Sequence, residues 1–359
     1  MTLLGDRLRR AWDDNRLTTA MLELTYACNL DCTFCYNDLG LEGRPLSLDQ
    51  YCTLLDDLAA LGALQVTLTG GEPLAHPRFF EIGRRATELG FILRIKSNGH
   101  ALKEPLARRV REELDPYMIE VSFHGASPAV HDRQTRVRGS FERLVSNLRV
   151  MRELGLRVLA NCTMTRWNEH EMAALYALTD ELGIRLNVYN EVSPRDDGDR
   201  SPLALSPTVD GMQALAALQS ERAERLRRER PELFEPVKGK AAERMGATPT
   251  KHCGAGSSNV TIDPYGNVLP CVEWRRPVGN LHERRLRDLW IAGSPELDKV
   301  RASTRAAKER VKALGPAGAA MNFCPGNAFT HSGDPLALYP AAERKLALAR
   351  GERVHLKIL

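Results

Sequence analysis

The stretch Cys28-Asn29-Leu30-Asp31-Cys32-Thr33-Phe34-Cys35-Tyr36 directly follows an apolar run at residues 21–26 that is typical of a β-strand. Three thiolates at this C-x₃-C-x₂-C spacing can ligate three corners of a cube-shaped iron–sulfur cluster, whose fourth corner is usually held by another cysteine. The next cysteine, Cys52, falls within a predicted helix, so one iron would stay open to a small molecule. The alternatives are cysteines of a hydrophobic core, or a zinc site, which would require a fourth Cys or His that this loop lacks.

The composition describes a chain of 359 residues, 43% of them hydrophobic, which is long enough for one large domain and a smaller one. The formal net charge of +4 is mild and the basic residues are interleaved with acidic ones, so no nucleic-acid partner is expected. No apolar run of about 18 residues predicts a membrane span, and the N-terminus lacks a signal-peptide pattern. Eight cysteines, grouped at ligand-like spacings, favour the reducing cytoplasm.

Strand-like and helix-like runs alternate along the first half of the chain. Strands are expected at residues 21–26, 64–69, 91–96, 118–123, 157–163 and 184–189. Helices are expected at residues 79–89, 141–154 and 171–182. A further helix should begin at Ser47, which forms a capping box with Gln50. About six βα units predict a parallel sheet with crossover helices, either open and doubly wound or an incomplete TIM-like barrel.

Gly70-Gly71-Glu72-Pro73 stands directly after the second strand, one βα unit after the cysteine loop. Glycines there let the backbone approach a ligand closely, and Glu72 adds a hydrogen-bond acceptor at the strand end. Alone, the motif also fits an ordinary strand-end turn. Asn98, Ser122 and His124 follow the next two strands, so polar residues gather at one rim of the predicted sheet.

The cysteine loop and this G-G-E-P segment together resemble the radical S-adenosylmethionine (SAM) enzymes. The resemblance implies a partial (β/α)₆ TIM-like barrel with its chemistry at the carboxyl ends of the strands. It also implies that Cys28, Cys32 and Cys35 hold a [4Fe–4S] cluster whose open iron binds the amino and carboxylate groups of SAM. An electron from the cluster would cleave SAM to methionine and a 5′-deoxyadenosyl radical, which abstracts a hydrogen atom from the substrate.

The same resemblance suggests roles for residues at the rim. The expected cofactor-binding residues are Tyr36, Gly70, Gly71, Glu72, Pro73, Asn98, Ser122, Arg136 and Asn161. The candidate catalytic residues, which would face the substrate, are His124, Tyr189, Asn190 and Glu191. Arg136 would pair with the SAM carboxylate, and the alternative is a solvated surface charge. For His124 the alternative is a strand-end histidine with satisfied hydrogen bonds, and Cys52 and Cys162 are expected to be core thiols.

A second cysteine set lies downstream, at Cys253, Cys271 and Cys324. Two β-like runs flank a D-P-x-G-N turn at residues 263–267, which predicts a β-hairpin that returns Cys271 toward Cys253. This region resembles the SPASM/twitch extension, which carries auxiliary [4Fe–4S] clusters. A complete SPASM domain has about seven cysteines, so one auxiliary cluster is expected here. Its fourth ligand would be missing, exogenous, substrate or a non-cysteine group such as His252, and a zinc site is the alternative.

The expected domain organisation has five segments. They are an N-terminal lead-in (1–19), the radical SAM partial barrel (20–206), a charged helical linker (207–245), the SPASM/twitch-like auxiliary domain (246–335) and a C-terminal tail (336–359). The charged helical run at residues 207–232 reads as a solvated helix face, with a docking surface for an acidic peptide as the alternative.

Relatives with this extension commonly modify ribosomally made peptides by crosslinking or epimerisation, so a peptide maturase is the first expectation. The alternatives are a radical SAM dehydrogenase, epimerase or decarboxylase acting on a sugar, aminoglycoside or nucleoside, and a non-catalytic iron–sulfur or zinc-binding module. The expected partners are the peptide or small molecule, an electron donor such as flavodoxin or ferredoxin, and a separate leader-peptide-binding protein. The lead-in is too short for a leader-binding domain of roughly 90 residues, which slightly favours a small molecule.

Overall fold

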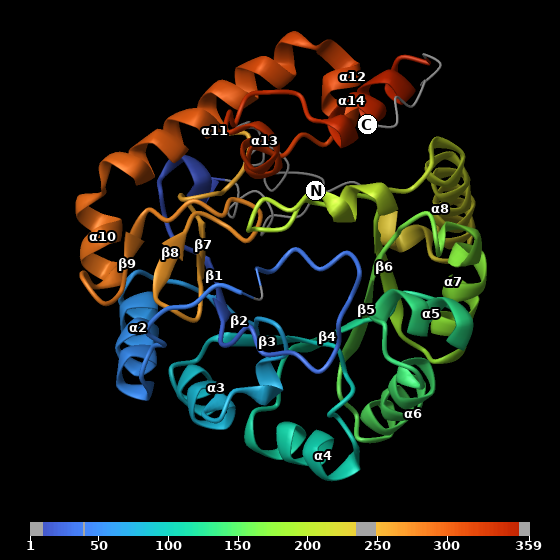
Figure 1. Cartoon of the computed structure of the whole chain (residues 1–359), viewed down its shortest axis with the longest axis horizontal. Helices are drawn as coiled ribbons and strands as arrows, with labels where there is room; N and C mark the ends of the chain where they lie inside the picture. The colour runs from blue at the N-terminus through green and yellow to red at the C-terminus, as the bar shows by residue number, and fades with distance from the viewer. Residues whose placement is uncertain (1–9, 39, 235–248, 352–359) are drawn as a thin grey trace.

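A computed structural model describes residues 10–38, 40–234 and 249–351, and it shows a sheet curved into an incomplete barrel with helices on its outer face (Figure 1). The six barrel strands are β1 (Thr19–Glu23), β2 (Gln65–Thr69), β3 (Ile92–Ser97), β4 (Met118–Ser122), β5 (Val158–Thr163) and β6 (Arg185–Tyr189). They pair side by side in parallel. Because the crossover helices cover one face only, the partial barrel is confirmed and the doubly wound alternative is not.

Helices connect the strands and pack on the outside of the barrel (Figure 1). They are α2 (Leu48–Ala60), α3 (Phe79–Glu88), α4 (Glu104–Glu113), α5 (Pro128–Thr135), α6 (Ser140–Glu153), α7 (Met172–Glu181) and α8 (Val209–Glu229), with 3₁₀ turns η1 (Pro73–Ala75), η2 (Glu169–Glu171), η3 (Ser201–Leu205) and η4 (Pro231–Phe234). Helix α2 begins where expected, because Ser47 and Gln50 form the capping box reciprocally. Helices α4 and α5 were not anticipated from the apolar pattern.

The two faces of the barrel strands differ in polarity. In β4, the fully buried Ile119 and Val121 pack in the main hydrophobic core together with helix residues such as Leu144 and Leu148. The residue between them, Glu120, points to the opposite, concave face, as the period of two requires. The apolar outer face fixes the register of each strand, and the concave face is left free for polar groups.

The second cysteine region extends the same sheet, whose strand order is β6-β5-β4-β3-β2-β1-β7-β8-β9. Strand β7 (Asn259–Ile262) pairs with β1 in parallel and with β8 (Asn267–Leu269) in an antiparallel hairpin, and β9 (Gly279–Asn280) lies at the edge. The hairpin confirms the expectation from the D-P-x-G-N turn. The parallel pairing with β1 was not expected, and it makes the barrel and the extension one continuous sheet.

The helices of the extension divide between the main core and a second, smaller core. They are α10 (Leu286–Ala292), α11 (Pro295–Ala313), α12 (Gly315–Ala320), α13 (Pro325–Ser332) and α14 (Pro340–Ala349). Helix α14 lies in the segment expected to be a tail, yet Ala342 and Leu346 are buried in the core that contains Phe323 and Tyr339. Of the expected linker, the structure shows α8 and η4, and residues 235–248 lie outside the described part.

Candidate functional site

The cysteine loop leaves the carboxyl end of β1 and crosses the concave side of the barrel (Figure 1). Two backbone N–H groups anchor it to α5: Asp31 N–H donates to the Thr135 carbonyl at 3.2 Å, and Thr33 N–H donates to the Gln134 carbonyl at 3.1 Å. The Phe34 ring packs edge-on against His124, with 4.8 Å between ring centroids. The loop is therefore held against the ends of later strands, as the resemblance implies.

The three thiols of this loop lie close enough to influence one another. Burial raises the pKa of Cys32, and the neighbouring Cys35 and Cys28 raise it further. The Leu30 N–H donates to Cys28 Sγ at 3.4 Å, and Asn98 Nδ2 lies 3.8 Å from the same sulfur. Adjacent buried thiols, whose ionised forms repel, suit a cationic iron–sulfur group that neutralises them, so the donor set fits the cluster.

Within residues 10–38, 40–234 and 249–351, no group of three or more His, Cys, Asp or Glu side chains is arranged so that it could bind one metal ion.

The G-G-E-P segment packs against the backbone that leads into the cysteine loop. Gly71 N–H donates to the Thr25 carbonyl at 2.7 Å and Glu72 N–H to the Ala27 carbonyl at 2.9 Å. A Cβ on Gly71 would stand 2.5 Å from the Tyr26 carbonyl oxygen, and Gly70 has a φ of +136°, so neither position accommodates a side chain. The two glycines thus let the G-G-E-P segment pack closely against the backbone that follows β1.

The Glu72 carboxylate is buried, with 3% of the residue exposed, and it accepts hydrogen bonds from the third strand end. Ser97 Oγ lies 2.9 and 3.0 Å from its two oxygens, and Asn98 N–H donates at 2.8 Å. Burial raises the pKa of Glu72, and these donors oppose that shift. Glu72 therefore joins the ends of β2 and β3. Pro73, also buried, begins η1 directly after it.

The other expected cofactor-binding residues lie around the same rim but differ in their contacts. Asn98 Nδ2 donates to Asn29 Oδ1 at 2.7 Å, inside the cysteine loop. Arg136 adopts a left-handed backbone at the end of α5, and its guanidinium lies 3.3 Å from the Asp31 carboxylate, with both side chains 61% exposed. Ser122 is partly exposed at the end of β4. Asn161 lies on the concave face of β5, where its Nδ2 donates to Glu120 at 2.8 Å.

The four candidate catalytic residues occupy two kinds of environment. His124 is buried, burial lowers its pKa to about 3, and its Nδ1 accepts the Thr163 N–H at 3.2 Å. Glu191 accepts from Asn327 Nδ2 and from Lys345 Nζ, each at 2.6 Å, so its carboxylate ties the end of β6 to the extension. Tyr189 is 52% exposed and Asn190 is partly exposed. Both therefore remain accessible to a substrate.

The downstream cysteines also come together. Burial raises the pKa of Cys271 well above its ordinary value, and the nearby Cys324 and Cys253 raise it further. The three thiols thus form a second donor set that fits an auxiliary cluster. His252 Nε2 lies 2.7 Å from the Phe323 carbonyl oxygen, which occupies one ring nitrogen of the suggested fourth ligand.

A buried charge network between the barrel and the extension was missed in the sequence. Arg275 NH1 lies 2.9 Å from Glu23 Oε1, Arg275 NH2 lies 2.6 Å from the Tyr26 hydroxyl, and Arg275 Nε lies 2.9 Å from Asp196 Oδ2. The Glu23 side chain is fully buried, and Arg275 is 10% exposed. Asp196 N–H also donates to the Tyr36 carbonyl at 2.8 Å. We name Glu23, Tyr26, Asp196 and Arg275 the Arg275 network, and it joins β1, the cysteine loop and the extension.

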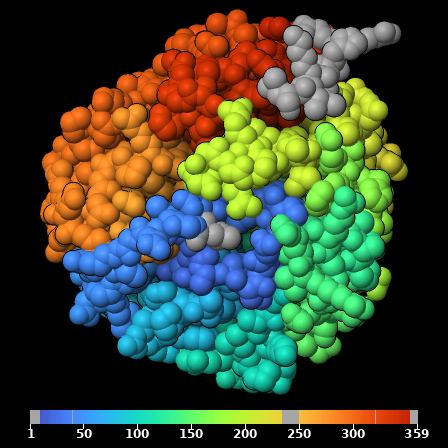
Figure 2. Space-filling model, viewed as in Figure 1, coloured from blue at the N-terminus to red at the C-terminus, as the bar shows by residue number. Residues whose placement is uncertain are grey.

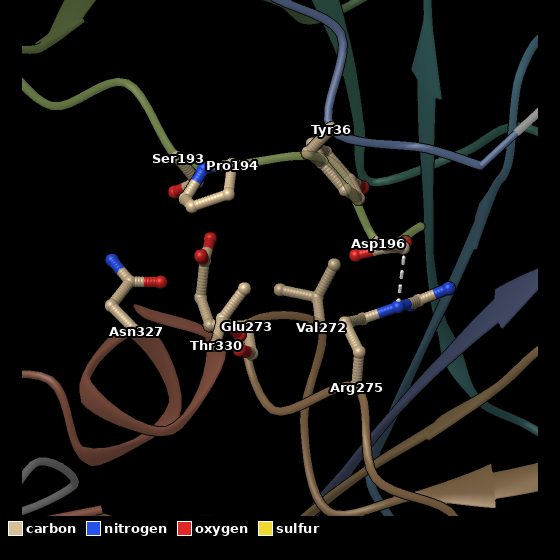
Figure 3. Close-up of a pocket in the computed structure, with 9 residues that line it drawn as sticks. All are labelled: Tyr36, Ser193, Pro194, Asp196, Val272, Glu273, Arg275, Asn327 and Thr330. Atoms are coloured by element: carbon tan, nitrogen blue, oxygen red, sulfur yellow. Dashed lines mark hydrogen bonds and ion pairs between the residues drawn. The ribbon is translucent and has the colours of Figure 1, made fainter. Parts of the chain in front are cut away.

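The segment after β6 lies beside the cysteine loop on the face shown in Figure 2, where Asp196 N–H reaches the Tyr36 carbonyl. A small pocket lies next to this segment, between barrel and extension (Figure 3). Tyr36 and Pro194 line one side of this pocket, and Glu273 and Asn327 line the other. Glu273 thus lines this pocket two residues after Cys271.

Comparison with known proteins agrees with this arrangement. Residues 22–179 match the radical SAM superfamily, and residues 253–313 match SPASM, an iron–sulfur cluster-binding domain. The PqqA peptide cyclase of Ruegeria pomeroyi is 29% identical over 335 residues, covering 90% of this chain and 87% of that protein. The PqqA peptide cyclase of Streptomyces rochei is 30% identical over 283 residues, covering 76% and 75%. The AdoMet-dependent heme synthase of Methanosarcina barkeri is 28% identical over 287 residues, covering 75% and 80%.

Solved structures share the fold. Streptococcus suis SuiB superposes with a TM-score of 0.61 at 18% identity, over 80% of this chain and 68% of that chain. The structure of anSMEcpe with bound AdoMet has a TM-score of 0.64 at 13% identity, over 93% and 97%.

The fold and the two cysteine sets define a SAM-cleaving iron–sulfur enzyme. The chain belongs to the radical SAM superfamily and carries a SPASM domain. Its cofactors are SAM, a [4Fe–4S] cluster in the barrel and iron–sulfur cluster chemistry in the SPASM domain. No helix within the described residues is long and apolar enough to span a membrane.

Proposed function

We propose that this radical SAM enzyme modifies a ribosomally made peptide, by a crosslink or by epimerisation. The observation that carries the proposal is the likeness to the Ruegeria PqqA peptide cyclase, which extends through both the barrel and the SPASM region. A second candidate, modification of a small molecule, is favoured by the comparable likeness to the Methanosarcina heme synthase. The concave face of the barrel is open enough to leave Tyr189 half exposed, which suits either substrate.

In this proposal Cys28, Cys32 and Cys35 hold the cluster, and SAM lies between the cysteine loop and the strand ends. The bound cluster and SAM together supply the electron transfer and the 5′-deoxyadenosyl radical. The protein's own part is to position groups. Glu72 fixes the Asn98 backbone, and Asn98 in turn contacts the loop at Asn29.

The remaining rim residues would bind SAM or orient the substrate. Ser122 and Asn161 would bind SAM from β4 and β5. Arg136, whose guanidinium is mostly exposed, would exchange its weak contact with Asp31 for the SAM carboxylate. Tyr36 and the glycines would shape the site through backbone positions. Tyr189 and Asn190 would face the substrate, together with His124 as a neutral hydrogen-bonding group.

The extension would hold one auxiliary cluster on Cys253, Cys271 and Cys324, for electron relay or substrate anchoring. An external electron donor such as flavodoxin or ferredoxin would reduce the barrel cluster. A separate leader-binding protein would present the peptide. The cytoplasm is the proposed compartment, because two sets of unpaired cysteines require a reducing environment.

The test is co-expression of the enzyme with peptides encoded by short open reading frames beside its gene. Mass spectrometry should show a loss of hydrogen atoms for a crosslink, or an unchanged mass with a D-residue after hydrolysis for epimerisation. The matched control is C28A/C32A/C35A, which cannot hold the barrel cluster. If the active enzyme modifies none of these peptides but converts a small molecule made by the products of neighbouring genes, the second candidate is favoured.

A further inference from the structure

A row of hydrogen-bonded polar side chains crosses the concave face of the barrel. Arg94 on β3 binds Glu120 on β4, with Nε at 2.9 Å from Oε1. Asn161 on β5 donates to the other oxygen, Oε2, at 2.8 Å, and Asn187 on β6 lies 3.4 Å from Asn161 Oδ1. The Glu120 carboxylate is thus satisfied on both oxygens, and the row as a whole carries no net charge.

Lys96 stands on the same face of β3 as Arg94, two residues further along the strand. Its ammonium lies 3.9 Å from Glu120 Oε2, beyond hydrogen-bond distance, and its side chain is 37% exposed. Among the described residues, Lys96 makes an ion pair with Glu120 alone. The Glu120 carboxylate is already neutralised by Arg94, whose NH2 lies 2.6 Å from Oε1. Lys96 therefore places a positive charge on the concave face that has no carboxylate at hydrogen-bond distance among the described residues, with Glu120 and the buried Glu273 within electrostatic reach.

The position of Lys96 places this charge close to the proposed reaction site. Asn98, two residues further along and also at the concave side, has its amide nitrogen 3.8 Å from Cys28 Sγ. Two residues of a β-strand span about 6.6 Å, so the Lys96 Cα is roughly one such step from that of Asn98. A ligand group that reaches Lys96 would thus bring adjoining C–H bonds near the cluster loop.

We infer that Lys96 binds a carboxylate of the peptide substrate and thereby selects the residue that is modified. The inference rests on the proposed function. The carboxylate could come from an Asp or Glu side chain or from the peptide C-terminus. An accessible ammonium with three donors, and with no hydrogen-bonded acceptor among residues 10–38, 40–234 and 249–351, matches a carboxylate better than a neutral group. Lys96 acts as a specificity-determining residue, because it anchors the substrate.

The experiment measures peptide binding to the cluster-loaded, SAM-bound enzyme without reductant, so that no turnover occurs. The probes are acetyl-Ala-Ala-Glu-Ala-Ala-amide, its Gln twin, and acetyl-pentaalanine with a free C-terminus. We expect at least one carboxylate-bearing probe to bind about tenfold more tightly than the Gln twin, as charge-assisted hydrogen bonds allow. Which of the two does so identifies the source of the carboxylate.

Three variants make the test specific. K96Q should abolish the preference, and K96R, which keeps the charge, should retain most of it. K103Q, which removes the exposed lysine before α4, should bind all three probes as the wild type does. Equal binding of the probes by the wild type, or a preference that survives in K96Q, would overturn the inference.

Two further outcomes are separate from these. If K96Q weakens SAM binding and leaves peptide binding unchanged, Lys96 is a SAM ligand and the inference fails. If the wild type binds the probes as expected yet forms no 5′-deoxyadenosine when reduced, the proposed function fails and Lys96 remains a carboxylate-binding residue.

Discussion

Replacing Arg275 with methionine should strongly destabilise the protein, because it leaves the Glu23 carboxylate buried without its cation. The Glu23 side chain is fully buried, and the Arg275 guanidinium contacts both of its oxygens at 2.9–3.1 Å. Breaking a buried ion pair by removing one partner typically costs about 3–5 kcal/mol. The Tyr26 hydroxyl and the Asp196 carboxylate lose a partner as well, so the upper part of that range is expected.

The double variant E23Q/R275M separates this explanation from a packing defect. It removes the uncompensated charge, so it should recover a large part of the stability lost in R275M. R276M is the matched control, because Arg276 is the next residue along the chain and pairs with Glu296 at a more exposed position. R276M should cost much less than R275M.

The assay is urea unfolding of the anaerobically reconstituted proteins, followed by far-ultraviolet circular dichroism and by cluster absorbance. Coincident transitions would justify a two-state treatment. A loss below about 1 kcal/mol in R275M would refute the reasoning, as would a double variant that is less stable than the single variant.

Three further predictions follow from the same contacts. C324A should lower the iron content of the reconstituted protein from about eight to about four per chain, measured by colorimetric iron assay, and a wild-type content near four would contradict the auxiliary cluster. E72Q should lower the free energy of unfolding by about 1–3 kcal/mol, because a neutral amide accepts less well from Ser97 and Asn98, and unchanged urea unfolding would contradict this. Burial raises the pKa of Asp196 to about 7, so the folded protein binds a proton that the unfolded chain releases near pH 4, and stability from this group should fall as pH rises from about 4 to 7. The wild-type melting temperature should therefore fall relative to D196N over pH 5–7, and parallel curves would contradict the assignment.

Local patterns predicted the features whose causes are local. The alternation of apolar runs located β1 to β6 to within three residues, and the Ser47 capping box located the start of α2. The cysteine spacing identified the first thiol set, whereas the predicted hairpin and the family resemblance identified the second, and the fold brings each set together. The strands, the capping box and the first thiol set depend on neighbours a few residues apart, which a single sequence displays directly.

The features that were missed depend on partners far apart in the sequence. Strand β7 joins β1 next to a Thr18–Ser258 hydrogen bond that spans 240 residues, and the Arg275 network joins residues 252 apart. Nothing near Arg275 in the sequence distinguishes it from Arg276, its exposed neighbour. The sequence around Glu191 likewise does not indicate that Lys345 neutralises it, because α14 was not anticipated as a packed helix.

The most direct test of the radical SAM assignment is 5′-deoxyadenosine formation by the anaerobically reconstituted, dithionite-reduced protein supplied with SAM, measured by liquid chromatography and mass spectrometry. The wild type should form 5′-deoxyadenosine, and C28A/C32A/C35A should form none, because it lacks the thiols that hold the barrel cluster. Absence of 5′-deoxyadenosine from a wild-type preparation with a full complement of iron would contradict the account.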